Sequence, residues 1–332
     1  MIANGSSQPS PQSQRRDTRA LVNAAEAALG VALDQLLGEP PDRWHPVAGF
    51  GSLMGRVEQA TYADRRTAGV VHLAVGVGVA VGTGLALRRL IGPKAATVFA
   101  TTCCVAGRML DDEASHVGRC LLRSDIPAAR LQVQRLVGRS TAELDEHGIT
   151  RAVIETVAEN CVDAVTASVL WATIAGAPGV LAHRAVNTLD AMVGHRNERY
   201  RQFGWASARL DDVMSYPAAR LSALAVAAVR PRHARAIART IRRDAPAHPS
   251  PNGGVIECAF AAALGVRLGG INRYGEVDED RGVLGDGRLC VAGDIAAATT
   301  LRRQTAGAFA VGLAIASWLA RGARAQLGSG RS

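Results

Sequence analysis

The stretch from residue 185 to residue 220, AVNTLDAMVGHRNERYRQFGWASARLDDVMSYPAAR, gathers side chains that suit a metal and phosphate site. It contains Asn187, Asp190, His195, Arg196, Asn197, Glu198, Arg199, Arg209, Asp211, Asp212 and Arg220. Carboxylate and amide oxygens are ligands that Mg²⁺ prefers, and arginine forms bidentate contacts with phosphate. Apolar segments flank the stretch, at 164–182 and 221–229. Ionisable groups beside membrane-length segments are functional candidates, so we expect a site here.

The end of this stretch contains an adjacent pair of aspartates. Arg209 and Asp212 are spaced i, i+3, so they can pair along a helix. Asp211 then points elsewhere and is free to bind a metal ion. Adjacent aspartates are also common at surface turns, so the hypothesis depends on the neighbouring Asn187 and Asp190.

A second group of carboxylates lies in RAVIETVAENCVDA, residues 151–164. Glu155, Glu159 and Asp163 follow each other at i, i+4 and i+8, which places them within about 80° of one helix face. Asn160 widens this polar arc. We expect no basic partner for the three carboxylates on the same helix. Because like charges at i, i+4 repel, the carboxylates need a counter-ion, either Mg²⁺ or arginines from another segment. The alternative is a solvated amphipathic face.

Two shorter segments carry polar groups on rigid turns. His248 and Asn252 lie in AHPSPNGG, where proline and glycine fix the backbone; the alternative is an ordinary turn before a helix. Trp44 and His45 lie in a loop within residues 36–58, and tryptophan favours a membrane interface. A lone His45 is more often structural than catalytic.

The composition limits the class of protein. The chain has 332 residues, of which 48% are hydrophobic and 20% charged, with 35 glycines and a net charge of +9. This is more apolar and richer in glycine than a typical soluble enzyme. The basic excess suits nucleic acid, anionic lipid or an anionic substrate. Aromatic residues are only 4% and the arginines are spread over the loops, so nucleic acid is the weakest of the three.

The basic and sulfur-containing residues exclude some common sites. Lys94 is the only lysine, and no Gly-rich GK[ST] phosphate loop is present. A bound nucleotide would therefore be held by arginines and metal-bridging carboxylates, although a GC-rich genome also explains the arginines. The six cysteines form no C-x-x-C pair, so we expect small buried hydrophobic residues rather than a zinc site.

Uncharged segments predict an all-α, multi-pass integral membrane protein with about four to six membrane-embedded helices. The clearest is 69–87, whose nineteen residues would span roughly 28 Å as a helix. The further candidates are 95–107, 164–182 (kinked at Pro178-Gly179) and 305–320, with weaker ones at 213–229 and 254–268. The alternative is a large soluble all-α core.

The domain organisation follows from these segments. Residues 1–19 are polar and predict a disordered tail, and 20–325 predict a single α-helical membrane domain. The first helix is expected at 20–37, and catalytic loops around 108–163, 184–220 and 244–254. No alternation persists long enough to predict a sheet.

Taken together, these blocks resemble the CobD/CbiB family of cobalamin biosynthesis, the adenosylcobinamide-phosphate synthases. The resemblance covers roughly residues 30–300 and rests on GEPPDRWHPV, VGRSTAEL, IETVAENCVDA, AVNTLDAMVGHRNERYRQFGWASARLDD and HPSPNGG. The family's members are multi-pass membrane proteins that join adenosylcobyric acid to aminopropanol, or its O-phosphate, through an ATP-dependent amide bond. Ser140, Ser168 and Ser215 depart from the family's pattern.

The resemblance implies roles for the residues above. Metal binding is expected at Asp211 and Asp212, with Glu159 beside them, and Glu155 or Asp163 as the base. The expected catalytic residues are Glu155, Glu159, Asp163 and Asp190. The expected substrate- and phosphate-binding residues are Asn160, Asn187, Asn197, Arg199, Arg209, Arg220, His248 and Asn252.

The resemblance also implies the surroundings of the protein. ATP with Mg²⁺ and a corrinoid are the expected ligands, and the expected location is the cell membrane with the site facing the cytoplasm. Other enzymes of the corrinoid pathway are possible partners, whereas nucleic acid is not expected. The rival interpretation is a membrane transporter or signalling protein that binds an anionic ligand without chemistry.

Overall fold

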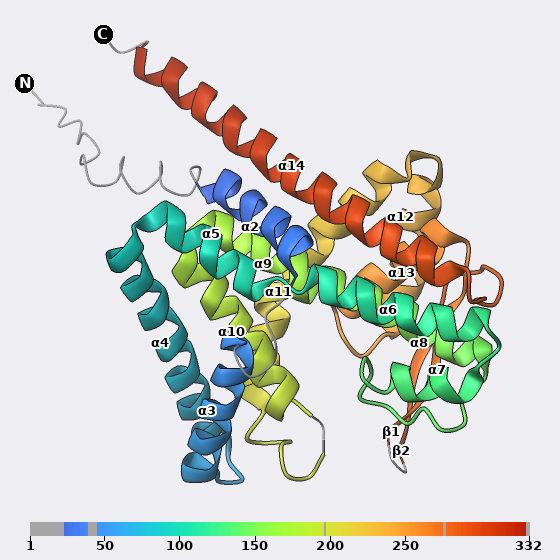
Figure 1. Ribbon diagram of the computed structural model, residues 1–332. Coiled ribbons are helices and arrows are strands. Elements are labelled where there is room, and N and C mark those ends of the chain that lie inside the picture. The colour runs from blue at the N-terminus through green and yellow to red at the C-terminus, as the bar shows by residue number, and fades with distance from the viewer. Residues whose placement is uncertain (1–22, 39–44, 196, 275–276, 330–332) are drawn as a thin grey trace, which may run out of the picture.

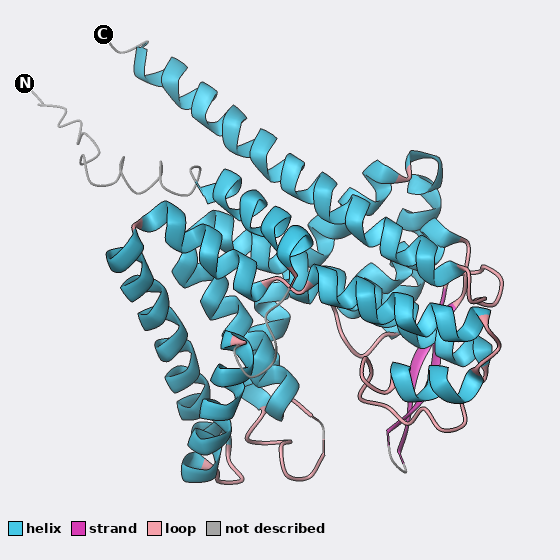
Figure 2. Ribbon diagram, viewed as in Figure 1, coloured by secondary structure: helices cyan, strands magenta, loops and turns pink. Residues whose placement is uncertain are grey.

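A computed structural model describes residues 23–38, 45–195, 197–274 and 277–329 (Figure 1). Helices make up most of these residues, as the sequence predicts (Figure 2). The predicted disordered tail, 1–19, and Trp44 lie outside the described residues. The first described helix, α2, begins at Asn23 and ends at Leu37, within the helix predicted at 20–37.

The remaining helices are α3 Pro46–Thr61, α4 Arg66–Ile91, α5 Pro93–Cys104, α6 Gly107–Leu122, α7 Ile126–Val133, α8 Glu146–Asn160, the π-helix η2 Cys161–Thr166, α9 Ala167–Ala175, α10 Ala177–Val193, α11 Trp205–Val229, the 3₁₀-helix η3 Pro231–His233, α12 Ala234–Asp244, the 3₁₀-helix η4 Ala245–Ala247, α13 Gly253–Leu264 and α14 Asp294–Ser329. Most of them follow one another with short connections, and longer ones separate α7 from α8, α10 from α11 and α13 from α14. Helices α3, α4 and α10 lie on one side of the molecule and α6, α7, α8, α12 and α13 on the other, while α14 crosses both (Figure 1). The predicted loop 108–163 is therefore largely helical.

Helix α4 confirms that the predicted 69–87 segment is one continuous helix. Among the described helices, only α4 is long and apolar enough to cross a bilayer. Its inner face is a row of small residues, including Gly76 and Gly84, which pack against Leu189 and Pro178 of α10. Large apolar side chains on its outer face are exposed: Val70, Val71, Val75, Val79 and Leu85.

The other predicted spans differ from expectation. The kink predicted at Pro178-Gly179 is wrong, because the chain breaks at Gly176 and divides 164–182 into η2, α9 and α10. Gly176 has φ of 66°, a conformation that glycine adopts without strain, and Pro178 then fits the first turn of α10. Helix α5, with 12 residues, is too short to span a bilayer alone. Segment 305–320 lies within the 36-residue α14.

A small antiparallel hairpin is the main feature that the sequence did not predict. Strands β1, Leu268–Tyr274, and β2, Val277–Leu284, pair with Leu268 opposite Leu284. The register shifts between Gly269 and Ile271, and Gly269 and Gly270 both have positive φ. This bulge interrupts the alternation of apolar and polar residues by which a strand is usually detected.

One buried ion pair joins two long helices in the core. Arg302 of α14 is 1% exposed, and its Nε donates to Oδ1 of Asp111 in α6 at 2.9 Å. Arg303 also lies 3.9 Å from Asp111, but its own side chain is half exposed. Removing one member of a buried pair leaves the other charge without compensation, which costs more than the pair itself contributes.

Arg302→Ala should lower the free energy of unfolding by about 3 kcal/mol, because Asp111 then stays buried with only a distant partner. Arg303→Ala is the matched control and should lower it by less than about 1 kcal/mol. Denaturant unfolding of the two purified variants measures both values. Equal effects would show that Arg302 does not stabilise the α6–α14 contact.

Candidate active site

Four carboxylates lie near enough to influence one another where α8, η2, α10 and α11 pack together. Glu159 and Asp163 come from α8 and η2, Asp190 from α10, and Asp211 from α11. Burial, followed by the charges of Asp211, Glu159 and Asp190, raises the pKa of Asp163 well above its usual value. The structure thus brings together residues that lie far apart in the sequence, Glu159 and Asp211 being 52 positions apart.

The aspartates contributed by α10 and α11 have pKa values near neutrality. Burial raises the pKa of Asp211 to about 7, and the charge of Asp190 adds to it. Burial likewise raises the pKa of Asp190 to about 6, with Asp212 as the next contributor. A carboxylate that titrates close to physiological pH can accept or release a proton during a reaction. This group is therefore the strongest candidate for acid–base chemistry in the described chain.

The backbone around Asp163 is a π-helix rather than an α-helix. Segment η2, Cys161–Thr166, follows α8 directly and contains Asp163. Single π turns inside helices frequently occur at functional sites. The wider turn changes the direction of Asp163 relative to the α-helical spacing assumed from the sequence. The predicted common arc of Glu155, Glu159 and Asp163 therefore does not hold as a simple α-helical face.

Asp211 and Asp212 point in different directions. Asp211 is buried and accepts a hydrogen bond from Nδ2 of Asn187 at 3.3 Å. Asp212 is about a third exposed and lies 4.0 Å from Nη1 of Arg209, so the predicted i, i+3 pair forms. Adjacent residues on a helix are about 100° apart, which explains the divergence.

The fit of Mg²⁺ to these residues is mixed. Oxygen ligands with excess negative charge suit a hard cation. In the part of the chain that the structure describes, however, no three His, Cys, Asp or Glu side chains converge closely enough to hold an ion. Asp211 and Asp212 have different neighbours, Asn187 and Arg209 respectively. Asp190 and Asp211 are the residues that would hold Mg²⁺, and its binding stays a prediction.

Glu155 lies apart from this group and has its own basic partners. Nη2 of Arg139 lies 2.8 Å from Glu155 Oε2, and Arg151, one turn earlier on α8, lies 3.8 Å from Oε1. The expectation of no basic partner on the same helix is therefore wrong. The N–H of Gly269 also donates to Glu155 at 2.8 Å. These contacts anchor the hairpin to α8, so Asp163 is the better candidate for the base.

The predicted turn at 247–254 joins the site through Arg220. Its guanidinium donates to Asn252 Oδ1 at 2.6 Å and to the Pro251 carbonyl at 2.9 Å, and it stacks on the Tyr216 ring. Asn252 Nδ2 in turn donates to the carbonyl of Asp212 at 2.8 Å. The turn is thereby fixed against α11 beside the carboxylates.

A buried glutamate that was not predicted as a site residue packs against this turn. Glu257 of α13 is fully buried, with His248 Nε2 at 3.4 Å and Arg281 Nη1 at 3.8 Å. Burial alone would lower the pKa of His248, but Glu257 outweighs it and raises that pKa. The signal was present in the sequence, because Glu257 interrupts the apolar segment 254–268.

Arg184 of α10 is the second residue that the sequence analysis missed. Its charge partly offsets the raised pKa of Asp163, and its Nη1 donates to Asn187 Oδ1 at 3.4 Å. It also borders an apolar hollow of about 220 Å³ between α3, α4, α5 and α10. Arg184 is therefore the arginine placed between that hollow and the carboxylates.

Three predicted binding residues are engaged in local contacts. Arg199 lies over the Tyr62 ring and 3.0 Å from Glu58 of α3, and the Asn197 side chain accepts from the N–H of Tyr200. These contacts hold the connection between α10 and α11 against α3. Asn160 donates to the Thr156 carbonyl of its own helix.

The departures Ser140, Ser168 and Ser215 lie in different surroundings. The N–H of Ser140 donates to the Arg273 carbonyl, and the Ser168 hydroxyl lies 3.5 Å from His183 Nδ1. Ser215 is fully buried on α11, one turn after Asp211. Of the three, Ser215 is thus the closest in sequence to the carboxylate group.

Comparison with known proteins identifies the family. The family described as CobD/Cbib protein matches residues 27–302, which is most of the chain. The chain belongs to the CobD/CbiB family. No solved structure matches the chain.

Relatives from several bacteria match along most of their length. The cobalamin biosynthesis protein CobD of Mycobacterium tuberculosis strain H37Rv is 46% identical over 286 residues, covering 84% of this chain and 91% of the relative. The protein of the same description from Chromobacterium violaceum is 42% identical over 287 residues, with 82% and 90% covered. That of Geobacter metallireducens is 42% identical over 264 residues, with 75% and 82% covered.

Asp211→Asn should stabilise the protein at alkaline pH. The pKa of Asp211 is higher in the folded chain than in the unfolded chain, so its ionisation disfavours folding. This penalty is absent below about pH 4, grows up to about pH 7 and is complete above that. We expect a gain on the order of 2 kcal/mol at pH 8 and no gain at pH 4.

Thermal unfolding across this pH range measures the effect, with Asp212→Asn as the control on the neighbouring, partly exposed aspartate. The control should gain little at any pH, because Asp212 already has Arg209 beside it. The same assay tests Mg²⁺, which should stabilise the unmodified protein at pH 8 more than Asp211→Asn. A pH-independent effect of Asp211→Asn would rule out a raised pKa at this position.

Proposed function

We propose that this protein acts in cobalamin biosynthesis as an ATP-dependent amide ligase. The substrates would be adenosylcobyric acid and aminopropanol or its O-phosphate, and the product adenosylcobinamide or its phosphate. Family membership and the names of the relatives support the pathway. The observation that carries the chemistry is the group of carboxylates with raised pKa values at Asp163, Asp190 and Asp211.

The reaction sets the chemical requirements of such a site. A carboxylate is a poor acyl donor, so it first attacks the γ-phosphoryl group of ATP, which gives an acyl phosphate and ADP. The amine nitrogen then attacks the acyl carbon, the C–O bond to phosphate breaks, and the nitrogen loses a proton. The enzyme must hold phosphate groups, balance their charge and provide a base for that proton.

Asp163 is our candidate for the base that accepts the amine proton. A base is most effective when its pKa lies near the working pH, and burial beside other carboxylates moves Asp163 in that direction. Glu159 and Asp190 contribute charge to this environment. When bound, Mg²⁺ would balance phosphate charge, and Asp190 and Asp211 are the residues that would hold it.

Two arginines are placed to contact phosphate. Arg209 is largely exposed and has one long ion pair, so its guanidinium can turn towards a ligand. Arg220 is fixed by the turn at Pro251 and Asn252, and a fixed guanidinium loses less freedom on binding. Asn187, beside Asp211, can orient a substrate amide or phosphate.

We also propose that the protein is a multi-pass protein of the cell membrane with this site open to the cytoplasm. The support is the exposed apolar surface, on α4 and on the far half of α14, where Val311, Ile315, Trp318 and Leu319 are exposed. A water-facing surface of this kind would be costly, whereas lipid would cover it. ATP, Mg²⁺ and corrinoid substrates are cytoplasmic, which favours that orientation.

A non-catalytic membrane protein that binds an anionic ligand is the second candidate function. The exposed Arg209 is the observation in its favour. Against it, the most buried charges of the site are carboxylates, which would repel an anion. A catalytic site needs such groups for proton transfer, whereas an anion-binding site does not.

Asp163→Asn should reduce turnover at least about 100-fold, because an amide cannot accept the proton. Detergent-solubilised protein is supplied with ATP, Mg²⁺, adenosylcobyric acid and each amine, and the corrinoid product is followed by mass. Asp112→Asn, an exposed aspartate on α6, is the matched control and should keep full activity. Full turnover by Asp163→Asn would exclude it as the base. A folded but inactive unmodified protein, with both amines, would favour the second candidate function.

A further inference from the structure

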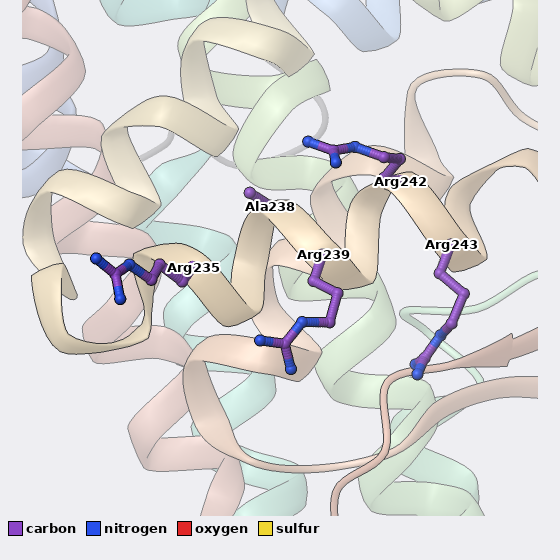
Figure 3. Close-up of a pocket in the computed structure, with 5 residues that line it drawn as sticks. All are labelled: Arg235, Ala238, Arg239, Arg242 and Arg243. Atoms are coloured by element: carbon purple, nitrogen blue, oxygen red, sulfur yellow. The ribbon is translucent and has the colours of Figure 1, made fainter.

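Helix α12, Ala234–Asp244, presents an exposed face of arginines that the proposed reaction does not use. Arg235, Arg239, Arg242 and Arg243 fall within about 100° of arc on this helix. Together with Ala238, they border a hollow of about 450 Å³ (Figure 3). The close-up shows their guanidinium groups extending outwards from the helix and well separated from one another.

In the part of the chain that the structure describes, one of these four arginines has carboxylate partners. Arg243 pairs with Asp244 and with Asp286 at 2.7 Å. Among the described residues, none of the carboxylates lies within ion-pair distance of Arg235, Arg239 or Arg242. Three unpaired guanidinium groups on one helical face repel one another unless an anion lies among them. The face is thus complementary to a surface with several negative charges.

The opposite face fixes the orientation of the helix. Ile237 and Thr240 are buried, and Asp244 accepts a hydrogen bond from the N–H of Gly285 at 2.9 Å. Helix α12 therefore cannot rotate to bury its arginines, and they stay directed away from the core. A basic helix face on a rigid support is suited to contact a partner without rearrangement.

The neighbouring helix supplies the reason to choose lipid as the partner. Helix α11 exposes Leu221 and Leu224 near its end, and only the short η3 separates it from α12. Arg230, between the two, donates to Gln304 of α14 at 2.7 Å. An exposed apolar surface followed directly by a basic one matches the order of hydrocarbon and headgroups in a membrane.

We infer that the arginine face of α12 binds the phosphate headgroups of anionic phospholipids. The inference rests on the membrane location proposed above. Arginine contacts phosphate oxygens through two N–H groups at once, and several spaced guanidinium groups can engage neighbouring headgroups. Binding of this kind would hold α12, and through α13 the His248–Glu257 contact, at the membrane surface.

The test compares two double variants of the full chain. Arg235→Gln/Arg239→Gln removes two charges of the α12 face, spaced i, i+4. Arg119→Gln/Arg123→Gln removes two exposed charges with the same spacing at the end of α6. Native mass spectrometry of each detergent-purified protein, titrated with phosphatidylglycerol and with phosphatidylcholine, measures the affinity for each lipid.

At low salt, the affinity of the α12 variant for phosphatidylglycerol should be about 25-fold lower than that of the unmodified protein, which is about fivefold for each arginine. Its affinity for phosphatidylcholine should not change. The α6 variant should keep the affinity of the unmodified protein. Equal affinities in both variants would overturn the inference. Displacement of the lipid by inorganic phosphate, or tighter retention of RNA than of lipid, would also overturn it, because the face would then serve a free anion or a nucleic acid.

The membrane location is tested separately, by extraction of native membranes with carbonate. Release of the protein from the membranes would contradict the proposed membrane location, whatever the lipid preference of the protein. If the protein stays in the membrane but the α12 variant keeps its affinity for phosphatidylglycerol, only the inference about α12 is contradicted.

Discussion

The repulsion between carboxylates buried at the junction of η2, α10 and α11 is the constraint on which the site depends. Asp163, Asp190 and Asp211 are ionised with difficulty, because burial and their mutual charge both favour the protonated form. Such an arrangement lowers stability at neutral pH, so packing elsewhere must compensate for it. The close contact of α4 with α10 through small residues is one such packing contribution.

Around this group, the structure separates charges that hold the fold from charges that remain available. Glu155 is occupied by Arg139, Arg151 and the Gly269 N–H, and Arg199 by Glu58 and tyrosine rings. Among the described residues, Asp211 accepts a hydrogen bond from one amide, and Arg209 has one long ion pair. A reacting group must be able to exchange its partner for a substrate, so the weakly engaged residues are the better functional candidates.

The surface of the molecule separates apolar side chains from basic ones. Exposed apolar residues gather on α4 and the far half of α14, whereas arginines gather on one face of α12. The first surface suits hydrocarbon and the second suits phosphate. The turn at 248–252 follows α12 and η4, packs on α13 through His248 and Glu257, and contacts α11 beside the carboxylates.

The sequence by itself determined the helical class, the continuous helix α4, the i, i+3 pair of Arg209 and Asp212, and the motifs of the CobD/CbiB family. These features depend on residue types and on contacts between residues a few positions apart, so the local sequence is enough to predict them. Tertiary structure alone decided the break at Gly176, the π-helix at Asp163 and the hairpin. It also decided which charges are compensated, because Glu257 meets His248 and Arg281, and Glu155 meets Arg139, only after distant segments pack together. Burial and charge pairing depend on all neighbours at once, and no local spacing encodes them.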